Sequence, residues 1–177
     1  MKNQNVERLI EFNDNWGKRV VKEYLINAGI NEADIFDTKK YDCVDLIISY
    51  HNSIQIIEIK NRYTPPKLYN HLPAFGLQDV KYEAMMNKKK ELEKYHQKPV
   101  IMYYANLAKD ELVCHNLNKI DITQLEVQER YTQRKNGSEI KDLHKYYQLP
   151  YSTGKINNIP KHFIDERNDF FSRSTWE

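Results

Sequence analysis

The chain has 177 residues, of which 40% are hydrophobic and 29% charged, and its net charge is only +2. This length suits one globular domain with a proper core, and so small a charge does not indicate a nucleic-acid partner unless basic residues gather locally. No apolar run approaches the roughly 20 residues of a membrane helix, and Glu7 and Glu11 interrupt the segment where a signal peptide would be apolar. We therefore expect a cytoplasmic protein with no membrane partner. Cys43 and Cys114 lie too far apart in the chain for a zinc-binding pair, and we expect them to stay reduced.

Hydrophobic periodicity predicts the secondary structure in chain order. Apolar residues recur at spacings of three and four over 5–28, which predicts a helix, although the polar segment 13–15 leaves open whether a second helix begins there. Two apolar strands, 43–50 and 53–60, flank the polar pair His51-Asn52, which is typical of a hairpin. Up to residue 117 the remaining pattern predicts a proline-rich loop at 64–73, a helix at 77–96, and strands at 99–106 and 111–117.

From residue 118 onward the pattern weakens. Short helical or strand pieces surround an Asn136-Gly137 turn, and 158–177 is typical of a terminal helix. The order of elements predicts an α/β fold, a mixed β-sheet flanked by helices. We expect residues 118–177 to extend the same domain and to carry substrate recognition or dimerisation. Candidates for recognition, chosen by composition alone, are Arg130, Arg134, Lys135, Tyr146, Tyr147 and Lys155.

The second strand of the hairpin ends in opposite charges. Glu58 and Lys60 follow an apolar run in "IQIIEIK", and side-chain alternation places both on one face. If the strands pair through His51-Asn52, residues whose numbers sum to about 103 or 104 lie opposite each other, so Asp45 faces Glu58 to within one residue. Two carboxylates and an ammonium are therefore expected at one end of an apolar hairpin.

This trio of charges suits the hydrolysis of a phosphodiester. Neighbouring carboxylates raise each other's pKa unless a cation intervenes, and hard oxygen ligands are those that Mg²⁺ and Mn²⁺ take. Such a metal can activate water and neutralise charge at a phosphate, while a lysine steadies the nucleophile or the developing phosphorane. The plain alternative is a surface ion pair at a strand end, which contributes little to stability, with Asp45 as a turn residue.

Two motifs resemble those of a known family. Asp45, twelve intervening residues and Glu58-Ile59-Lys60 resemble the core of the PD-(D/E)XK nuclease superfamily, which includes restriction endonucleases, archaeal Holliday-junction resolvases and RecB-type nuclease domains. Gln78 and Tyr82 fit the Q-x-x-x-Y motif that follows the E-x-K strand in RecB-like nucleases, and they share one helical face. By this resemblance, Gln78 and Tyr82 would orient the lysine or the scissile phosphate.

The resemblance, which covers residues 5–106, implies a restriction-endonuclease-like fold with its nuclease core in 1–117. It also implies an Mg²⁺-dependent deoxyribonuclease, in which Mn²⁺ would substitute. Asp45 and Glu58 would bind the metal with the backbone carbonyl of Ile59, and Lys60 would position or activate the attacking water. Restriction enzymes and resolvases of this size usually work as homodimers, so we expect one here. The sequence contains no P-loop, so we expect no nucleotide cofactor.

The chain departs from the family pattern in two places. Val44 stands where the family has a proline before its first acid, and Asp42 competes for the role of that acid with poorer spacing. The acid that the family carries on its first helix has no clear counterpart. We favour Asp14 as a metal ligand, although an N-cap role is equally compatible with it. Glu11 follows as the second choice, and Glu23 lies on a different face.

Basic and aromatic residues near the motifs are candidates for nucleic-acid binding. The connection after the E-x-K strand resembles a loop that contacts DNA, and the following helix has a lysine-rich face that suits phosphates. A proline-stiffened connector and a solvated helix face would show the same residues. The candidates are Arg62, Lys67, Tyr69, Lys81 and Lys88.

The sequence as a whole thus leads us to expect a metal-dependent nuclease that hydrolyses DNA. An endonuclease is favoured over an exonuclease, of the restriction, resolvase or phage and mobile-element type. The alternative is a nucleic-acid-binding protein that keeps the nuclease fold without cleaving, which an absent first-helix acid would fit.

Overall fold

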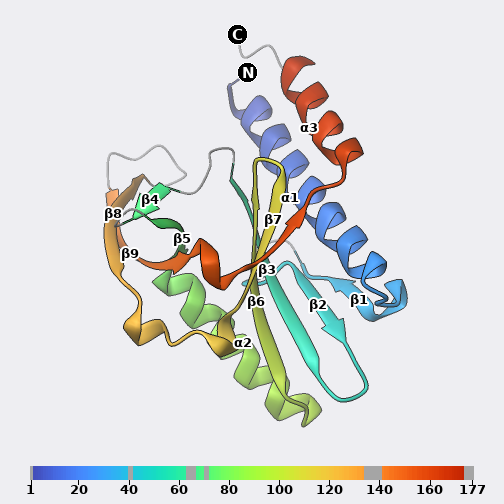
Figure 1. The fold of residues 1–177 in the computed structure, drawn as a ribbon, viewed down its shortest axis with the longest axis vertical. Coiled ribbons are helices and arrows are strands. Elements are labelled where there is room, and N and C mark those ends of the chain that lie inside the picture. Colours follow the sequence, from blue (N-terminus) through green and yellow to red (C-terminus); the bar gives the residue numbers. More distant parts are fainter. Residues whose placement is uncertain (1, 40–41, 63–66, 70–71, 134–140, 174–177) are drawn as a thin grey trace.

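A computed structural model describes residues 2–39, 42–62, 67–69, 72–133 and 141–173 (Figure 1). Within these ranges the chain has an α/β fold with three α-helices, a six-stranded mixed sheet and a four-stranded antiparallel sheet. The helices are α1 (Lys2–Asn27), α2 (Asp79–His96) and α3 (Lys161–Arg173). None of these described helices is long and apolar enough to cross a membrane.

The larger sheet holds the predicted hairpin near its centre. Its strands follow the order β1 (Ile35–Asp37), β2 (Leu46–Ser49), β3 (Ile54–Arg62), β6 (Val100–Ala108), β7 (Glu111–Asn116) and β10 (Lys155–Asn158). β3 and β6 run parallel, with α2 in the connection between them, and the other neighbours pair antiparallel. The almost unbroken apolar run of β3 fits this position, because a strand inside the sheet is covered on both faces.

The smaller sheet lies beside α2 (Figure 1). Its order is β4 (Lys67–Tyr69), β5 (Leu72–Gln78), β9 (Lys141–Pro150) and β8 (Val127–Gln133). The prediction of a loop over 64–73 is therefore wrong for the part that the structure describes. Pro73 pairs with Leu68 of β4 but lies outside the ladder between β5 and β9, and proline is tolerated at the start of a strand.

Apolar side chains pack on both faces of the larger sheet, and alternate residues of β3 serve the two cores. Ile56 packs with Phe75 in the core beneath α2 and the smaller sheet, whereas Ile57 packs with Trp16 in the core beneath α1 and α3. The indole N–H of Trp16 donates to the carbonyl of Phe163 at 3.0 Å, which ties α1 to α3. The protein thus has three layers, with α1 and α3 on one side of the sheet and α2 on the other (Figure 1).

Most elements predicted before residue 118 are confirmed to within a few residues. α1 continues without a break through 13–15, so no second helix begins there. The weakly patterned C-terminal part supplies strands to both sheets and ends in α3, which matches the predicted terminal helix. The predicted Asn136-Gly137 turn lies outside the described residues. Strands β1 and β10 were not predicted, because three or four residues carry too little periodicity.

Candidate active site

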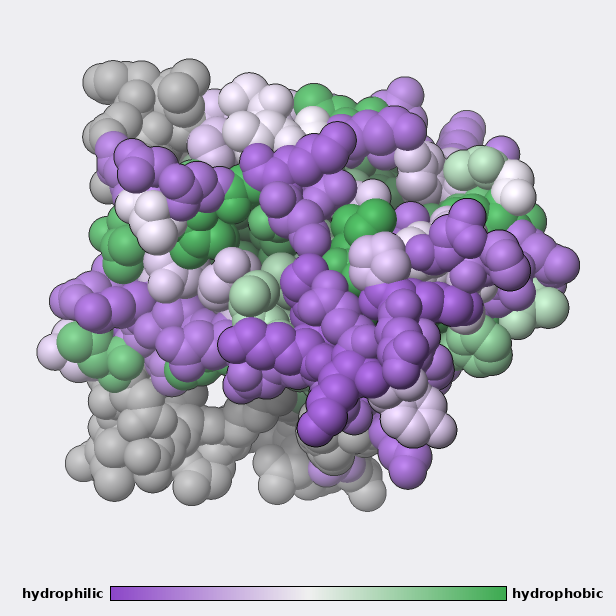
Figure 2. Space-filling view, turned by 90° about the horizontal axis from the view of Figure 1, so that it is seen from below, coloured by the Kyte–Doolittle hydropathy of each residue, from purple (hydrophilic) through white to green (hydrophobic). Residues whose placement is uncertain are grey.

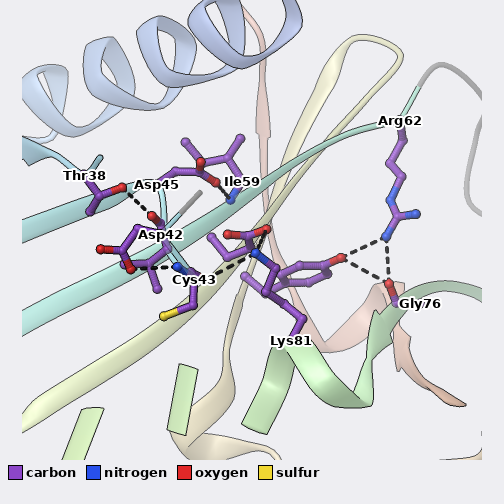
Figure 3. A network of polar contacts seen from close by, with 11 residues as sticks. Thr38, Asp42, Cys43, Asp45, Ile59, Arg62, Gly76 and Lys81 are labelled. Carbon is purple, nitrogen blue, oxygen red and sulfur yellow. Dashed lines mark hydrogen bonds and ion pairs between the residues drawn. The ribbon is translucent and has the colours of Figure 1, made fainter. Parts of the chain in front are cut away.

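The β2–β3 hairpin places Asp45 beside Glu58, and its predicted register is confirmed. Leu46 pairs with Ile57, so Asp45, one residue earlier, lies next to Glu58. The N–H of Asp45 donates to the carbonyl of Ile57 at 2.8 Å. Oδ2 of Asp45 accepts a hydrogen bond from the N–H of Ile59 at 2.7 Å (Figure 3). The carboxylate of Asp45 is therefore fixed against the end of β3.

The carboxylate of Glu58 is buried and paired. Only 4% of Glu58 is exposed, and Nζ of Lys81, reaching from α2, lies 2.8 Å from Oε1 of Glu58. The same ammonium donates to the carbonyl of Cys43 at 3.4 Å (Figure 3). Burial, followed by the charge of Asp45, raises the pKa of Glu58 to about 7, although Lys81 opposes the rise. Two carboxylates are thus crowded at this point, and one of them titrates close to neutral pH.

Lys60 lies two residues further along the same face of β3, at the exposed edge of the site. Desolvation lowers its pKa, attraction to Glu58 opposes the change, and the positive charges of Arg62 and Lys81 add to it. An ammonium with a lowered pKa gives up its proton more readily than an ordinary lysine. A role in exchanging a proton with a water molecule therefore fits Lys60 better than a role in a passive ion pair.

A pocket of about 170 Å³ opens between α1 and the ends of β2 and β3. Asp14, Asp45, Ile59 and Lys60 all line it, so the structure brings together four of the predicted site residues. Glu58 does not line this pocket, because its carboxylate turns toward Lys81. The other lining residues are Ile10, Asn13 and Asn61.

α1 reaches this pocket because Gly17 has no side chain. A Cβ at Gly17 would lie 3.1 Å from the amide nitrogen of Asn61 and 3.2 Å from Cγ2 of Ile59. The side-chain amide of Asn61 also donates to the carbonyl of Asn13. These contacts hold the turn of α1 that carries Asp14 over the end of β3.

The three acids of α1 that the sequence offers as metal ligands differ in their position relative to the pocket. Asp14 and Glu11 are both exposed, but only Asp14 lines the pocket. Glu23 lies near α3, where its carboxylate is 3.3 Å from Nε2 of His162. This placement favours Asp14 over the other two, because Asp14 lines the same pocket as Asp45.

If the expected metal-dependent nuclease is correct, replacing Asp14 with asparagine should weaken Mn²⁺ binding and slow cleavage by about tenfold, because a carboxylate near a metal raises the affinity of the site. Glu11→Gln removes the same charge one turn earlier and should leave both quantities unchanged. Titration calorimetry with Mn²⁺ and single-turnover cleavage rates would test this difference. Equal effects of the two substitutions would remove Asp14 from the site.

The donor set fits a hard divalent cation. Within the described parts of the chain, no three His, Cys, Asp or Glu side chains gather closely enough to bind a metal ion by themselves. Mg²⁺, however, is commonly bound by one or two carboxylates and keeps several water molecules. Asp45 and Glu58, with the carbonyl of Ile59, supply that number of oxygen donors at the end of the hairpin. After burial, the charge of Asp45 contributes to the raised pKa of Glu58, and a bound cation would relieve this repulsion between the two carboxylates.

Arg62 lies in an internal hydrogen-bond network. Nη2 donates to the carbonyl of Gly76 at 2.7 Å and to the hydroxyl of Tyr104 at 3.0 Å (Figure 3). Nε donates to Oδ1 of Asn106 at 3.3 Å. The Tyr104 hydroxyl also donates to the Gly76 carbonyl at 3.1 Å. Arg62, which the sequence suggested for DNA binding, thus connects β3 to β5 and β6. It is not presented to solvent as a free cation.

Gln78 and Tyr82 are placed differently from the expectation of a shared helical face. Gln78 is the last residue of β5 and the N-cap of α2, and α2 itself begins at Asp79. Tyr82 packs against the core, with its ring centroid 5.9 Å from that of Tyr147 in an edge-to-face arrangement. Lys81, between the two motif residues, is the one whose side chain reaches Glu58.

The remaining candidates for nucleic-acid binding are only partly described. Lys67 and Tyr69 belong to β4, but their side chains lie outside the described structure. Lys88 lies 3.8 Å from carboxylate oxygens of both Asp42 and Glu91. The lower end of the molecule, where α2 ends, shows mainly hydrophilic side chains with separate apolar groups (Figure 2). Lys88 is therefore engaged with carboxylates of the protein itself.

The C-terminal candidates for substrate recognition are also only partly described, and those that are described contact other residues of the protein. Arg134 and Lys135 lie outside the described residues. Tyr147 packs against Tyr82, and Nζ of Lys155 lies 5.7 Å from the ring centroid of Tyr24. Arg130 and Tyr146 contact each other, with the guanidinium 5.2 Å from the centroid of the Tyr146 ring.

Sequence reasoning missed the partner of Glu58. Lys81 was assigned to DNA because it lies on a lysine-rich helix, and nothing local in the sequence indicates which strand that helix faces. Asn61 was missed as well, although it directly follows Lys60. Its position one residue beyond the motif was a usable signal, because alternation places it on the α1 side of β3.

No protein-family model and no curated protein sequence matches this chain. The case for a function therefore rests on these residues and their arrangement.

Proposed function

We propose that this protein is a metal-dependent nuclease of the PD-(D/E)XK type that hydrolyses phosphodiester bonds of DNA. The observation that carries the proposal is the convergence of Asp14, Asp45, Ile59 and Lys60 on one pocket, with Glu58 next to Asp45. The acid, the E-x-K motif and a first-helix carboxylate come from three separate segments. A chance match of a short motif does not by itself bring such residues together.

The fold is consistent with this family. A restriction-endonuclease-like fold is a mixed sheet flanked by helices, with the site at one edge. Here a mixed sheet has α1 and α2 on opposite faces, and the acid and lysine lie where the hairpin strands end. We propose the restriction-endonuclease-like fold on this basis.

Asp45, Glu58 and the carbonyl of Ile59 would hold Mg²⁺, with Mn²⁺ as a substitute, and Asp14 would complete the set from α1. When bound, the metal supplies activation of water and neutralisation of charge at the phosphate. Lys60 would donate hydrogen bonds to the attacking water or to the phosphate oxygens, and its lowered pKa would let it accept and release a proton during the reaction.

Lys81 gives this site a competitor for the metal. Its ammonium already pairs with the Glu58 carboxylate at 2.8 Å. A metal ion that binds Glu58 therefore has to share this carboxylate with Lys81 or displace the ammonium. This competition favours weak metal binding in the absence of DNA. Substrate phosphates would then supply additional ligands, as they commonly do for Mg²⁺.

The test is cleavage of supercoiled plasmid and of a branched oligonucleotide by the purified protein, with Mg²⁺ or Mn²⁺ against EDTA. Nicking or linearisation that requires the metal is the expected result. Binding of both substrates without any cleavage in either metal would favour the alternative, a binding protein that keeps the fold. Neither binding nor cleavage would contradict both.

A further inference from the structure

The side chain of Arg130 on β8 is held in a fixed position by two uncharged neighbours. Its Nε donates to Oε1 of Gln128 at 2.9 Å, and its Nη2 donates to the same oxygen. The central carbon of the guanidinium lies over the ring of Tyr146 on β9, 5.2 Å from the centroid. Neither contact carries negative charge, so both orient the cation without neutralising it.

The fixed guanidinium keeps hydrogen-bond donors available for a ligand. Arginine has five N–H donors, and Gln128 takes two of them, which leaves three. A planar fork of N–H groups matches two oxygens of a phosphate, and an arginine that is already ordered loses less conformational entropy on binding. The chemistry of this group therefore suits a phosphodiester oxygen pair.

The Arg130 position is connected to the candidate active site through the smaller sheet. Tyr146 pairs with Gln78, the first residue of the Q-x-x-x-Y motif. A Cβ on Gly76, two residues earlier, would lie 3.2 Å from Cδ1 of Tyr146. The carbonyl of Gly76 accepts hydrogen bonds from Arg62 and from Tyr104.

Tyr104 completes this connection on the larger sheet. It is the residue that pairs with Glu58 in the parallel ladder of β3 and β6. The path from Arg130 to the catalytic carboxylate therefore runs over adjacent, contacting residues of β8, β9, β5 and β6. His144 lies directly opposite Arg130 in the β8–β9 register and adds another donor on the same face.

We propose that Arg130, held by Gln128 and Tyr146, binds a backbone phosphate of the nucleic acid outside the catalytic pocket. The substrate strand would run across this face of the smaller sheet on its way to Asp45 and Lys60. The inference rests on the proposed function for the identity of the ligand. A phosphate contact of this kind positions the strand and carries no sequence preference.

The test measures binding separately from cleavage. The full-length protein is titrated with a short fluorescein-labelled DNA duplex in EDTA, and anisotropy gives the Kd over a series of salt concentrations. Arg130→Gln should weaken binding by about tenfold and lower the slope of log Kd against log salt by about one, because one phosphate contact is lost. Lys145→Gln is the matched control. It removes the same charge from the neighbouring position of the hairpin, on the opposite face and across from Glu129.

A second variant separates orientation from charge. Gln128→Leu keeps the positive charge but removes the acceptor that holds it, so the affinity should fall while the salt slope stays that of the wild type. If Arg130→Gln and Lys145→Gln give the same Kd and the same slope, the inference is wrong.

The outcome is independent of the nuclease test. A protein that cleaves DNA but binds it equally well after Arg130→Gln overturns this inference and leaves the proposed function standing. A protein that never cleaves but loses affinity and slope in Arg130→Gln supports the inference without the nuclease.

Discussion

Replacing Lys60 with methionine is expected to reduce metal-dependent cleavage by about 1,000-fold, the range found when a positioned acid–base group is removed. Lys60 lies at the exposed edge of the site, where it lines the pocket together with Asp14 and Asp45. Its ammonium has Arg62 and Lys81 as like-charged neighbours. Methionine keeps the length of the side chain and removes one of three neighbouring positive charges, so the fold should tolerate the change.

Single-turnover cleavage of a labelled duplex at saturating protein measures this loss without the contribution of product release. Lys90→Met, an exposed lysine of α2 outside the pocket, is the matched control and should cleave as the wild type does. DNA affinity in EDTA should change little in Lys60→Met. A variant that still cleaves at a rate near that of the wild type would show that Lys60 does not take part in the chemistry.

The second large effect concerns Glu58 and the pH dependence of stability. The carboxyl has a pKa of about 7 in the folded protein against an ordinary value of 4.5. The folded state therefore holds this proton more tightly than the unfolded chain does. The resulting contribution to stability is complete below pH 4.5 and is lost as the pH rises through about 7. A difference of this size corresponds to about 3 kcal/mol of unfolding free energy.

Glu58→Gln should remove this pH dependence, because glutamine imitates the neutral carboxyl and does not titrate. Urea unfolding at about pH 5 and about pH 8 measures the free energy of each protein. We expect the wild type to lose more stability than Glu58→Gln as the pH rises, and Mg²⁺ to restore part of the loss in the wild type alone, since metal binding needs the ionised carboxylate. Glu83→Gln, on the exposed surface of α2, serves as the control. Parallel pH curves for the wild type and Glu58→Gln would contradict the account.

The part of the site that the sequence could predict is the part that local geometry determines. A two-residue connection fixes which residues of a hairpin face each other, and the observed pairing of Leu46 with Ile57 follows from that rule. Alternation along β3 then assigns Glu58 and Lys60 to one face and Asn61 to the other. The helix, strand and terminal-helix predictions also depend on local periodicity, and most of them hold.

What could not be predicted depends on contacts between distant segments. The ion pair between Lys81 and Glu58 depends on how α2 crosses over the sheet between β3 and β6. The position of Arg62 depends on the carbonyl of Gly76, which belongs to a sheet that the sequence did not reveal. β9 pairs with β5 across about 70 intervening residues, and β8 joins this sheet through β9. No local pattern encodes a pairing over such a separation. The sequence already favoured Asp14 over Glu11, but that Asp14 shares a pocket with Asp45 depends on how α1 packs on the sheet.

The most direct test of the nuclease proposal compares two aspartates three residues apart. Asp45 accepts the N–H of Ile59 and lines the pocket, whereas Asp42 accepts the N–H of Cys43 at 2.7 Å and lies near Lys88. Plasmid cleavage in Mg²⁺ and in EDTA would be measured for the wild type, Asp45→Asn and Asp42→Asn. Asparagine preserves a hydrogen-bond acceptor at either site, so only the negative charge is lost. We predict metal-dependent cleavage by the wild type and by Asp42→Asn, and none by Asp45→Asn. Cleavage by Asp45→Asn at the rate of the wild type, or no metal-dependent cleavage by the wild type, would contradict the assignment of this site.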